Sequence, residues 1–419
     1  MFISKIKSKT LQDLLKVLSG NIVAQGVGFL TIIIISRDLG PEQYGIFSLL
    51  LAIFTVAVQI SDFGVSTSYV KYVSENLSKA KGIFVTVILS KVALSLIIIV
   101  ALYFLSGVIS DFFFESRKYQ KLIELIAVAI LFQSFFGVII GHFQAIQNFK
   151  VFAYLNISHN LLKLISIIII SFSFSQEKHL EYFILSYAFV VIFLIFSISI
   201  KNYKLFRYIK QFDFNYFIQI YKLGFWVFLS SLAVILYLRI DIFMIQKLLN
   251  SEEVGYYSVA VSLGLIFPLI TSSLTATILP KLDSYLKNNS INDYIKIIMK
   301  KSVYVIVLLS LCIIISPIMI EIFFGSVYSG SILVFQILLI GHAINIIINP
   351  ISLVLYKINK AHIATISNFI QLPINVFANL LLIPTFGIIG AATSTVFIYI
   401  FNGIFIVLYL KIYSSKEFK

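Results

Sequence analysis

The stretch SRDLGPEQYGIFS, Ser36–Ser48, recurs in weaker form as KLLNSEEVGYYS, Lys247–Ser258. The repeat aligns Gly45 with Gly255, and each copy separates two long apolar runs. Because both copies lie in a chain that is almost entirely apolar, the repeat indicates two versions of one membrane-embedded unit. We therefore expect a two-lobed membrane protein whose working site lies between the lobes.

Composition excludes a soluble globular protein. Hydrophobic residues make up 60% of the 419 residues and charged residues only 12%, and the mean hydropathy is +1.01. The net charge of +14 does not indicate nucleic-acid binding, because the cations are shared among short loops and no soluble basic domain is present to hold a duplex. The basic residues instead carry a topology signal.

Apolar stretches long enough to cross the hydrocarbon core recur about twelve times. We place them near residues 14–36, 43–66, 83–107, 122–145, 152–174, 180–200, 223–248, 256–279, 301–324, 330–355, 362–384 and 388–411. They lack the alternating polar pattern of a membrane barrel, and each span must satisfy its own backbone hydrogen bonds. The fold class expected is an all-α polytopic membrane protein.

Six spans per half is an even number, so both lobes cross the membrane in the same orientation and a pseudo-twofold axis is expected along the membrane normal. The predicted organisation is an N-terminal lobe (1–200), a cytoplasmic amphipathic linker (201–222) and a C-terminal lobe (223–419). The linker mixes Lys and Arg with Phe and Tyr, which suits an anionic inner leaflet. Residues 281–301 predict a second interfacial helix.

Most of the 32 lysines and arginines fall in loops on the side of the N-terminus. This asymmetry over short loops predicts that both termini are cytoplasmic. The repeated loops then lie on the outer face, between equivalent helices. We expect four of their charged residues to form short hinges or gates above the working site: Arg37, Asp38, Glu42 and Glu252.

Two equivalent spans carry matched polar stripes. The fifth has Asn156, His159, Asn160 and Lys163 on one helical face, and the eleventh has Asn368, Gln371, Asn375 and Asn379 on one face. Polar side chains in lipid are costly, so such stripes face the bundle interior or a water-filled cavity. One alternative is that the amides only hold helices together by hydrogen bonding; the matching on equivalent helices favours a substrate cavity.

Few charges lie within the predicted spans, and each costs roughly 2.5–3.5 kcal/mol at a helix centre. Arg239 and Asp241 lie near the middle of the seventh span, on different faces, and Lys163 lies too deep to reach the interface easily. Lys91 suits either a snorkelling lysine or a functional one. Asp62, in ISDFGVS, is positioned to cap a helix that resumes at Ser66, and it is also a candidate for ion coupling together with Asp241.

The chain resembles the polysaccharide-exporting, Wzx-like branch of the multidrug, oligosaccharidyl-lipid and polysaccharide exporter superfamily. The resemblance rests on LSGNIVAQGVGFLTIIIISRDLGPEQYGIFSLLLAI with the following DFG step, on RIDIFMIQKLLNSEEVGYYSVA, and on the late GIIGAATSTVFIYI. It implies a fold like that of the multidrug and toxin extrusion (MATE) transporters. It also implies a flippase for undecaprenyl-pyrophosphate-linked repeat units of O-antigen or capsule in a bacterial inner membrane.

A lipid that carries pyrophosphate and sugars needs cations, amides and an opening toward membrane lipid. We expect Lys163 and Arg239 to meet the pyrophosphate, and the asparagines and Gln371 of the two stripes to meet sugar hydroxyls. No enzyme motif, cofactor site or metal site is recognised, and no ATP-binding loop is present. A monomer is expected, with a polysaccharide polymerase and a chain-length regulator as candidate partners.

Other classes stay open. A multidrug or cation antiporter of the same superfamily favours carboxylates, whereas the intramembrane charges named above are three cations and two carboxylates. A lipid II flippase usually has extra helices. A polysaccharide polymerase or ligase needs a larger outer loop than residues 107–121 provide. A scaffold without transport would not need the buried charges.

Overall fold

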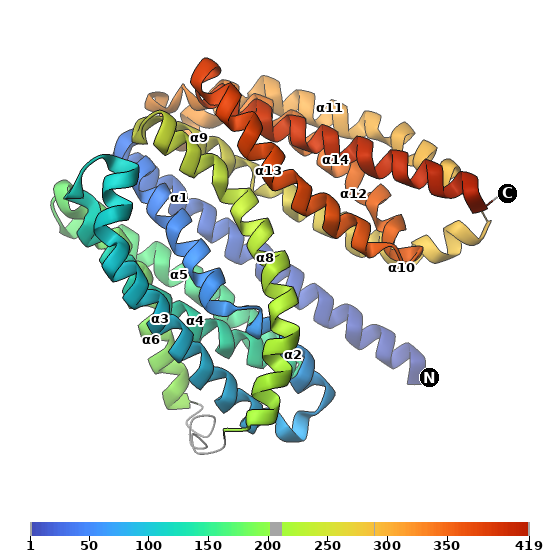
Figure 1. The fold of residues 1–419 in the computed structure, drawn as a ribbon, viewed down its shortest axis with the longest axis horizontal. Coiled ribbons are helices and arrows are strands. Elements are labelled where there is room, and N and C mark those ends of the chain that lie inside the picture. Colours follow the sequence, from blue (N-terminus) through green and yellow to red (C-terminus); the bar gives the residue numbers. More distant parts are fainter. Residues whose placement is uncertain (1, 202–211, 289, 418–419) are drawn as a thin grey trace. The chain divides into compact units, whose positions relative to one another are not determined.

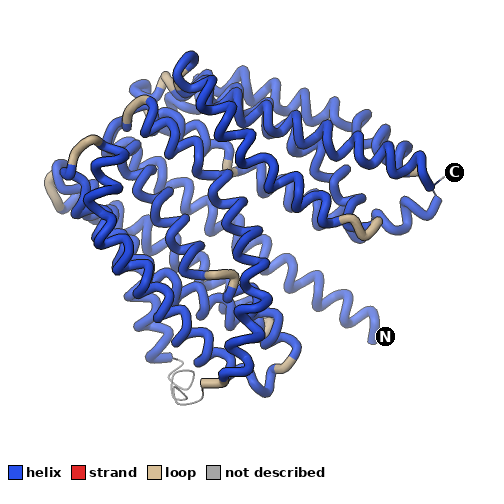
Figure 2. Tube along the Cα trace, in the orientation of Figure 1, coloured by secondary structure: helices blue, strands red, loops and turns tan. Residues whose placement is uncertain are grey.

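The computed structural model describes residues 2–201, 212–288 and 290–417, and these ranges are helical almost throughout. Figure 2 shows helices joined by short loops, with no strand in the described ranges. Apolar side chains cover much of the helix surface, as expected where lipid is the solvent. The predicted all-α fold class is confirmed.

Most predicted spans have a matching helix, but one helix covers the first two spans, a short helix follows the second, and the eighth span is divided at Leu265 (Figure 1). In chain order the structure has α1 (Phe2–Asp62), α2 (Val65–Glu75), α3 (Ala80–Phe114), α4 (Gln120–Ala145), α5 (Phe149–Ser173), α6 (His179–Lys201), α8 (Phe214–Leu248), α9 (Ser251–Gly264), α10 (Ile266–Asn288), α11 (Ile291–Phe324), α12 (Ser331–Lys357), α13 (Ala361–Phe386) and α14 (Ile388–Glu417).

Within the described ranges, eleven stretches are long and apolar enough to cross a membrane. The first, Ser19–Asp62, has 44 residues, about twice what the hydrocarbon core requires. It contains two helices, because the backbone turns at Gly40 (φ 72, ψ 174) and resumes at Pro41. Glycine tolerates this positive φ, and proline suits the first position of a helix. The predicted first two spans are thus separate membrane crossings.

The predicted break near Asp62 is confirmed. The helix ends at Asp62, Phe63 and Gly64 have φ values of 47 and 68, and α2 begins at Val65. Asp62 caps the new helix, since its carboxylate accepts hydrogen bonds from the Ser66 hydroxyl at 2.5 Å and from the Ser66 backbone N–H at 3.4 Å.

The interfacial helix predicted over residues 281–301 is wrong. That stretch is divided between the end of α10 and the start of α11. The Ser290 hydroxyl caps α11 by accepting from the backbone N–H of Asp293 at 3.1 Å, so a new helix starts inside the predicted one. In the predicted linker, residues 202–211 lie outside the described ranges, and residues 214–222 belong to α8.

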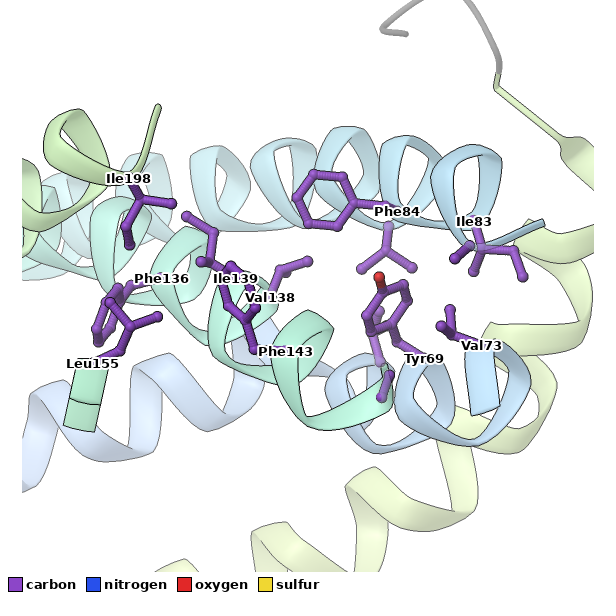
Figure 3. Packing of buried hydrophobic residues seen from close by; sticks show 14 of the residues in the cluster. Tyr69, Val73, Ile83, Phe84, Phe136, Val138, Ile139, Phe143, Leu155 and Ile198 are labelled. Atoms are coloured by element: carbon purple, nitrogen blue, oxygen red, sulfur yellow. The ribbon is translucent and has the colours of Figure 1, made fainter. Parts of the chain in front are cut away.

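The chain forms two compact units. Unit 1 contains the residues up to Leu39 and Leu49–Ile235, and unit 2 contains Gly40–Ser48 and the residues from Leu236 onward. In unit 1, α4 packs against α2, α3, α5 and α6. Its core includes Tyr69, Phe84, Phe136 and Phe143 (Figure 3). Burial raises the pKa of the Tyr69 phenol, whose hydroxyl lies 2.6 Å from His142 Nδ1.

In unit 2, α12 has the corresponding central position. It packs against α9, α10, α11, α13 and α14. Ile351, Val354 and Leu355 of α12 form a core with Leu282 of α10 and Leu410 of α14. The predicted fourth and tenth spans, α4 and α12, are equivalent under the sequence repeat, and each packs against at least four other helices of its unit. This agreement supports the duplication.

Candidate functional site

The polar stripe of the fifth span lies along α5 beside the first half of α1. A Cβ added to Gly20 would lie 2.7 Å from Ala153, and one added to Gly28 would lie 3.3 Å from the side-chain oxygen of Asn160. Glycine at these positions lets the two helix backbones approach closely. Asn160 also donates a hydrogen bond to the backbone oxygen of Asn156 at 3.0 Å. The stripe is therefore packed inside unit 1 at its first turns.

Lys163 continues this stripe one turn further. Its side chain is half-buried, and its ammonium lies 4.3 Å from the centre of the Tyr187 ring on α6. Among the side chains that the structure describes, no carboxylate lies within 4.0 Å of this ammonium. Lys163 thus lies within a predicted membrane span, and no carboxylate of the described side chains pairs with it.

Lys91, the other lysine within a span of unit 1, is neutralised. It is only 2% exposed, and its ammonium lies 2.5 Å from Asp62 Oδ1 and 3.0 Å from the Ser66 hydroxyl. Its charge therefore does not snorkel to the interface, and the snorkelling alternative is wrong. The pair ties the break between α1 and α2 to α3. Lys91 and Asp62 therefore balance each other's charge, and neither needs a substrate to explain its place in the membrane span.

We predict that breaking this pair from one side destabilises the protein more than removing both charges. Lys91→Met or Asp62→Asn leaves a buried charge without its partner, which typically costs about 3–5 kcal/mol, whereas an uncharged replacement of both is often neutral. The apparent Tm of the purified protein in detergent should fall in each single variant and recover in the double variant. A double variant that falls by the sum of the two single effects would contradict the pairing.

In unit 2 the eleventh-span stripe converges with Asp241 on α8. The Asp241 carboxylate accepts hydrogen bonds from the Tyr257 hydroxyl at 2.6 Å, from the Asn379 amide at 2.7 Å and from the Thr395 hydroxyl at 2.8 Å. All of these donors are neutral. No lysine, arginine or histidine nitrogen lies within 4.0 Å of Asp241 among the described side chains. A buried carboxylate with only neutral donors is poised to hold a cation.

The asparagines around Asp241 form a second layer. Asn379 also donates to the side-chain oxygen of Asn375 at 2.7 Å and accepts from the Ser394 hydroxyl. Asn375 and Asn379 are both fully buried, whereas Asn368 at the other end of the stripe is exposed and accepts from the buried Gln371 amide at 3.2 Å. The stripe therefore divides into an exposed end and a buried end that supports Asp241. Arg239, two residues before Asp241, is half-buried.

The repeated glycines, from which the duplication was inferred, contact one another's helices within unit 2. A Cβ added to Gly45 would lie 1.6 Å from the backbone oxygen of Ser251, and one added to Gly255 would lie 2.0 Å from that of Pro41. Pro41 and Ser251 occupy the same position in the two repeats, the first residue of a helix. The contact is therefore reciprocal, as in a symmetric helix pair.

The charged residues predicted as gates differ in their surroundings. Arg37, Glu42 and Glu252 are exposed. Asp38 is half-buried and is held by the turn between α5 and α6, because its carboxylate lies 2.6 Å from His179 Nδ1 and its backbone oxygen accepts from Gln176 at 3.0 Å. The contacts of Asp38 lie in unit 1, whereas those of Gly45 lie in unit 2. A gating role for these loops stays a prediction.

Sequence reasoning missed Tyr187 beside Lys163, Tyr257 and Thr395 beside Asp241, and the partnership of Lys91 with Asp62. Each of these contacts joins different helices, so helical spacing along one segment could not reveal it. The sequence carries one signal for the ion pair. With both termini cytoplasmic, Asp62 and Lys91 lie toward the cytoplasmic ends of the second and third predicted spans, and a buried charge usually has a partner at similar depth.

Together, the eleven long apolar helices of the described ranges indicate a multi-pass membrane protein, and each of its two units buries a charged side chain, Lys91 in unit 1 and Asp241 in unit 2. The chain matches the model of the family described as "Polysaccharide biosynthesis protein" over residues 10–286. Because this match covers well over half of the sequence, the chain belongs to that family. The family resemblance expected from the sequence motifs is confirmed.

A curated relative supports the same relationship over nearly the whole chain. It is described as a probable low-salt glycan biosynthesis flippase, Agl15, from Haloferax volcanii; it is 24% identical over 413 residues, which cover 97% of this chain and 84% of the relative. Among solved structures, a lipid II flippase, MurJ, in an inward closed conformation matches with a TM-score of 0.77 at 18% identity, covering 94% of this chain and 86% of that one.

A multidrug resistance MATE transporter of the MOP superfamily, solved in an inward-facing conformation, also matches. The TM-score is 0.68 at 14% identity, with 94% of this chain and 95% of that chain covered. At these identities the two structural likenesses establish the fold and not the substrate. The fold is therefore that of the exporter superfamily, as the sequence resemblance implied.

Proposed function

We propose that this protein is a flippase that moves undecaprenyl-pyrophosphate-linked oligosaccharide repeat units from the cytoplasmic to the outer leaflet, for a surface polysaccharide. We place it in the inner membrane with both termini cytoplasmic. The observation that carries the proposal is the contrast between the two lysines of unit 1. Lys91 has a carboxylate partner, whereas Lys163 has none among the described side chains and lies next to amides.

An unneutralised ammonium inside a membrane span is matched best by an anionic ligand that enters the span. Phosphate oxygens accept strong charge-assisted hydrogen bonds from lysine. Amide side chains suit sugar hydroxyls, since each offers both donors and an acceptor. In the proposed complex Lys163 of unit 1 contacts the pyrophosphate, and Asn156 and Asn160 contact the sugars. Arg239, Asn368 and Gln371 of unit 2 are further proposed substrate contacts. Family membership and the glycan flippase Agl15 as a relative support this class of substrate.

Ligand-dependent stabilisation of the purified protein tests the substrate class. A polyprenyl-pyrophosphate that carries a short oligosaccharide should raise the apparent Tm in detergent, because a ligand that binds only the folded state stabilises it by mass action. The same polyprenol without the pyrophosphate is the control. If an organic cation such as tetraphenylphosphonium raises the Tm and the glycolipid does not, the protein is an antiporter for cations and the proposal fails.

We propose that Asp241 holds the coupling cation, either a proton or a monovalent metal ion. The Asp241 carboxylate is surrounded by the Tyr257 and Thr395 hydroxyls and the Asn379 amide, which also donates to Asn375, and hard cations prefer oxygen ligands such as this carboxylate. The amides of Asn375 and Asn379 are assigned to this site and not to the sugars. Asp62 is not proposed for coupling, since its charge is balanced by Lys91.

The Asp241→Asn variant should transport without a response to ion gradients. The amide keeps a side chain of similar shape but removes the charge that attracts a cation. In vesicles, an imposed sodium or proton gradient should stimulate the wild type, and the variant should respond to neither. Glu177→Gln, an exposed carboxylate in the turn before α6, is the matched control and should behave as wild type. Full stimulation of Asp241→Asn would exclude the coupling role.

A further inference from the structure

An aromatic ring from another helix lies beside the Lys163 charge. Lys163 lies on α5 and Tyr187 on α6, two helices that pack against each other in unit 1 (Figure 1). The ammonium lies over the ring at 4.3 Å from its centre, well inside the range of a cation–π interaction. Both side chains are half-buried, so neither is sealed into the core.

A ring serves this lysine differently from a carboxylate. An ion pair, such as that of Lys91 with Asp62, neutralises the charge and occupies its hydrogen-bond donors. The face of an aromatic ring attracts the ammonium through its quadrupole and carries no net charge. Lys163 therefore keeps its full charge, and the ammonium, which has three donors, can still donate to an anion on the side away from the ring.

The other groups of the stripe do not fix the ammonium. The Asn160 amide donates to the backbone oxygen of Asn156, and His159 is buried with its ring 5.1 Å from that of Phe136. A lysine has a flexible four-carbon stem, and its conformational freedom must be lost when it binds a ligand. A ring that holds the ammonium before the ligand arrives reduces this loss.

We infer that Tyr187 is a positioning residue, which holds the Lys163 ammonium in place for the phosphate groups of a lipid-linked substrate. This inference rests on the proposed function, because it requires Lys163 to bind an anion. The ring acts through Lys163, and the Tyr187 hydroxyl is not needed for the effect. Substitutions that keep the ring should therefore keep binding, and substitutions that remove it should weaken binding only when Lys163 is present.

Calorimetric titration of geranylgeranyl diphosphate into the purified full-length protein in detergent tests the inference. Geranylgeraniol, which lacks the anionic group, is the control ligand. Tyr187→Leu should raise the Kd roughly tenfold, the range expected for a partly desolvated cation–π contact. Tyr187→Phe should stay within about twofold of wild type, since its ring is retained. Both variants must elute as monodisperse protein; if Tyr187→Leu does not, Tyr187→Met takes its place.

The double variant with Lys163→Met separates positioning from a general structural role. If Tyr187 acts through Lys163, adding Tyr187→Leu to Lys163→Met changes the Kd no further. Provided that Lys163→Met alone binds the diphosphate weakly, three outcomes would overturn the inference. They are an unchanged Kd in Tyr187→Leu, a loss of affinity in Tyr187→Phe equal to that in Tyr187→Leu, and a further loss of affinity in the double variant. If Lys163→Met itself binds the diphosphate like wild type, the proposed anion site fails instead.

Discussion

We expect Lys163→Met to abolish surface polysaccharide export and Lys150→Met to leave it at the wild-type level. The two lysines lie on the same helix, but Lys150 is exposed at its start and Lys163 lies deep in the span. Removing one partner of a desolvated, hydrogen-bonded charge pair typically costs about 2–5 kcal/mol, which corresponds to a loss of roughly 30-fold or more in substrate affinity. Methionine keeps the length and apolar character of the lysine stem without its charge.

The measurement is complementation. Cells that lack their own repeat-unit flippase express each variant, and polysaccharide on the cell surface is quantified against the amount of variant in the membrane. Arg239→Ala is expected to lose export as well. If Lys163→Met and Arg239→Ala both give full surface polysaccharide at normal membrane levels, neither cation is required for export.

We expect Gly45→Ala and Gly255→Ala each to destabilise the fold and impair export. The added methyl carbon would lie 1.6 Å from the Ser251 oxygen in the first variant and 2.0 Å from the Pro41 oxygen in the second. No side chain can occupy such positions, so the two helix starts must separate. Overpacking typically costs about 1–3 kcal/mol, and a clash with backbone atoms, which cannot rotate away, belongs at the upper end of that range or above it.

The apparent Tm in detergent measures this effect. Gly26→Ala is the matched control, because a Cβ at Gly26 meets nothing within 4 Å and alanine favours a helix over glycine. Its Tm should equal or exceed that of wild type. If Gly45→Ala and Gly255→Ala keep the wild-type Tm and export, the reciprocal glycine contact is not a feature of the folded protein.

The helices could be predicted from the sequence because a membrane span satisfies its backbone hydrogen bonds within itself, so hydropathy along one segment suffices. The repeat around Gly45 and Gly255 predicts a loop in each copy, whereas the structure has helices that start at Pro41 and Ser251, inside these segments. The error at residues 281–301 arose because a polar, basic stretch that ends one long helix and begins another resembles a separate amphipathic helix.

The site could be predicted only in part. Helical spacing placed Lys163 with Asn156 and Asn160, since these residues share one segment. It could not show that Asn379 donates to Asp241, because that contact joins α13 to α8. The sugar-contact role first expected for Asn375 and Asn379 came from the stripe alone, and their burial beside Asp241 favours an ion site.

Translocation in sealed vesicles tests the central claim most directly. Purified protein is reconstituted into liposomes that contain a polyprenyl-pyrophosphate-linked oligosaccharide, and a membrane-impermeant glycosidase is added outside. Without a flippase only the glycan of the outer leaflet, about half of the total, is cleaved. The account predicts that wild-type protein makes nearly all of it accessible and that Lys163→Met does not. Cleavage that stops at the outer-leaflet half with active, correctly folded wild-type protein would contradict it.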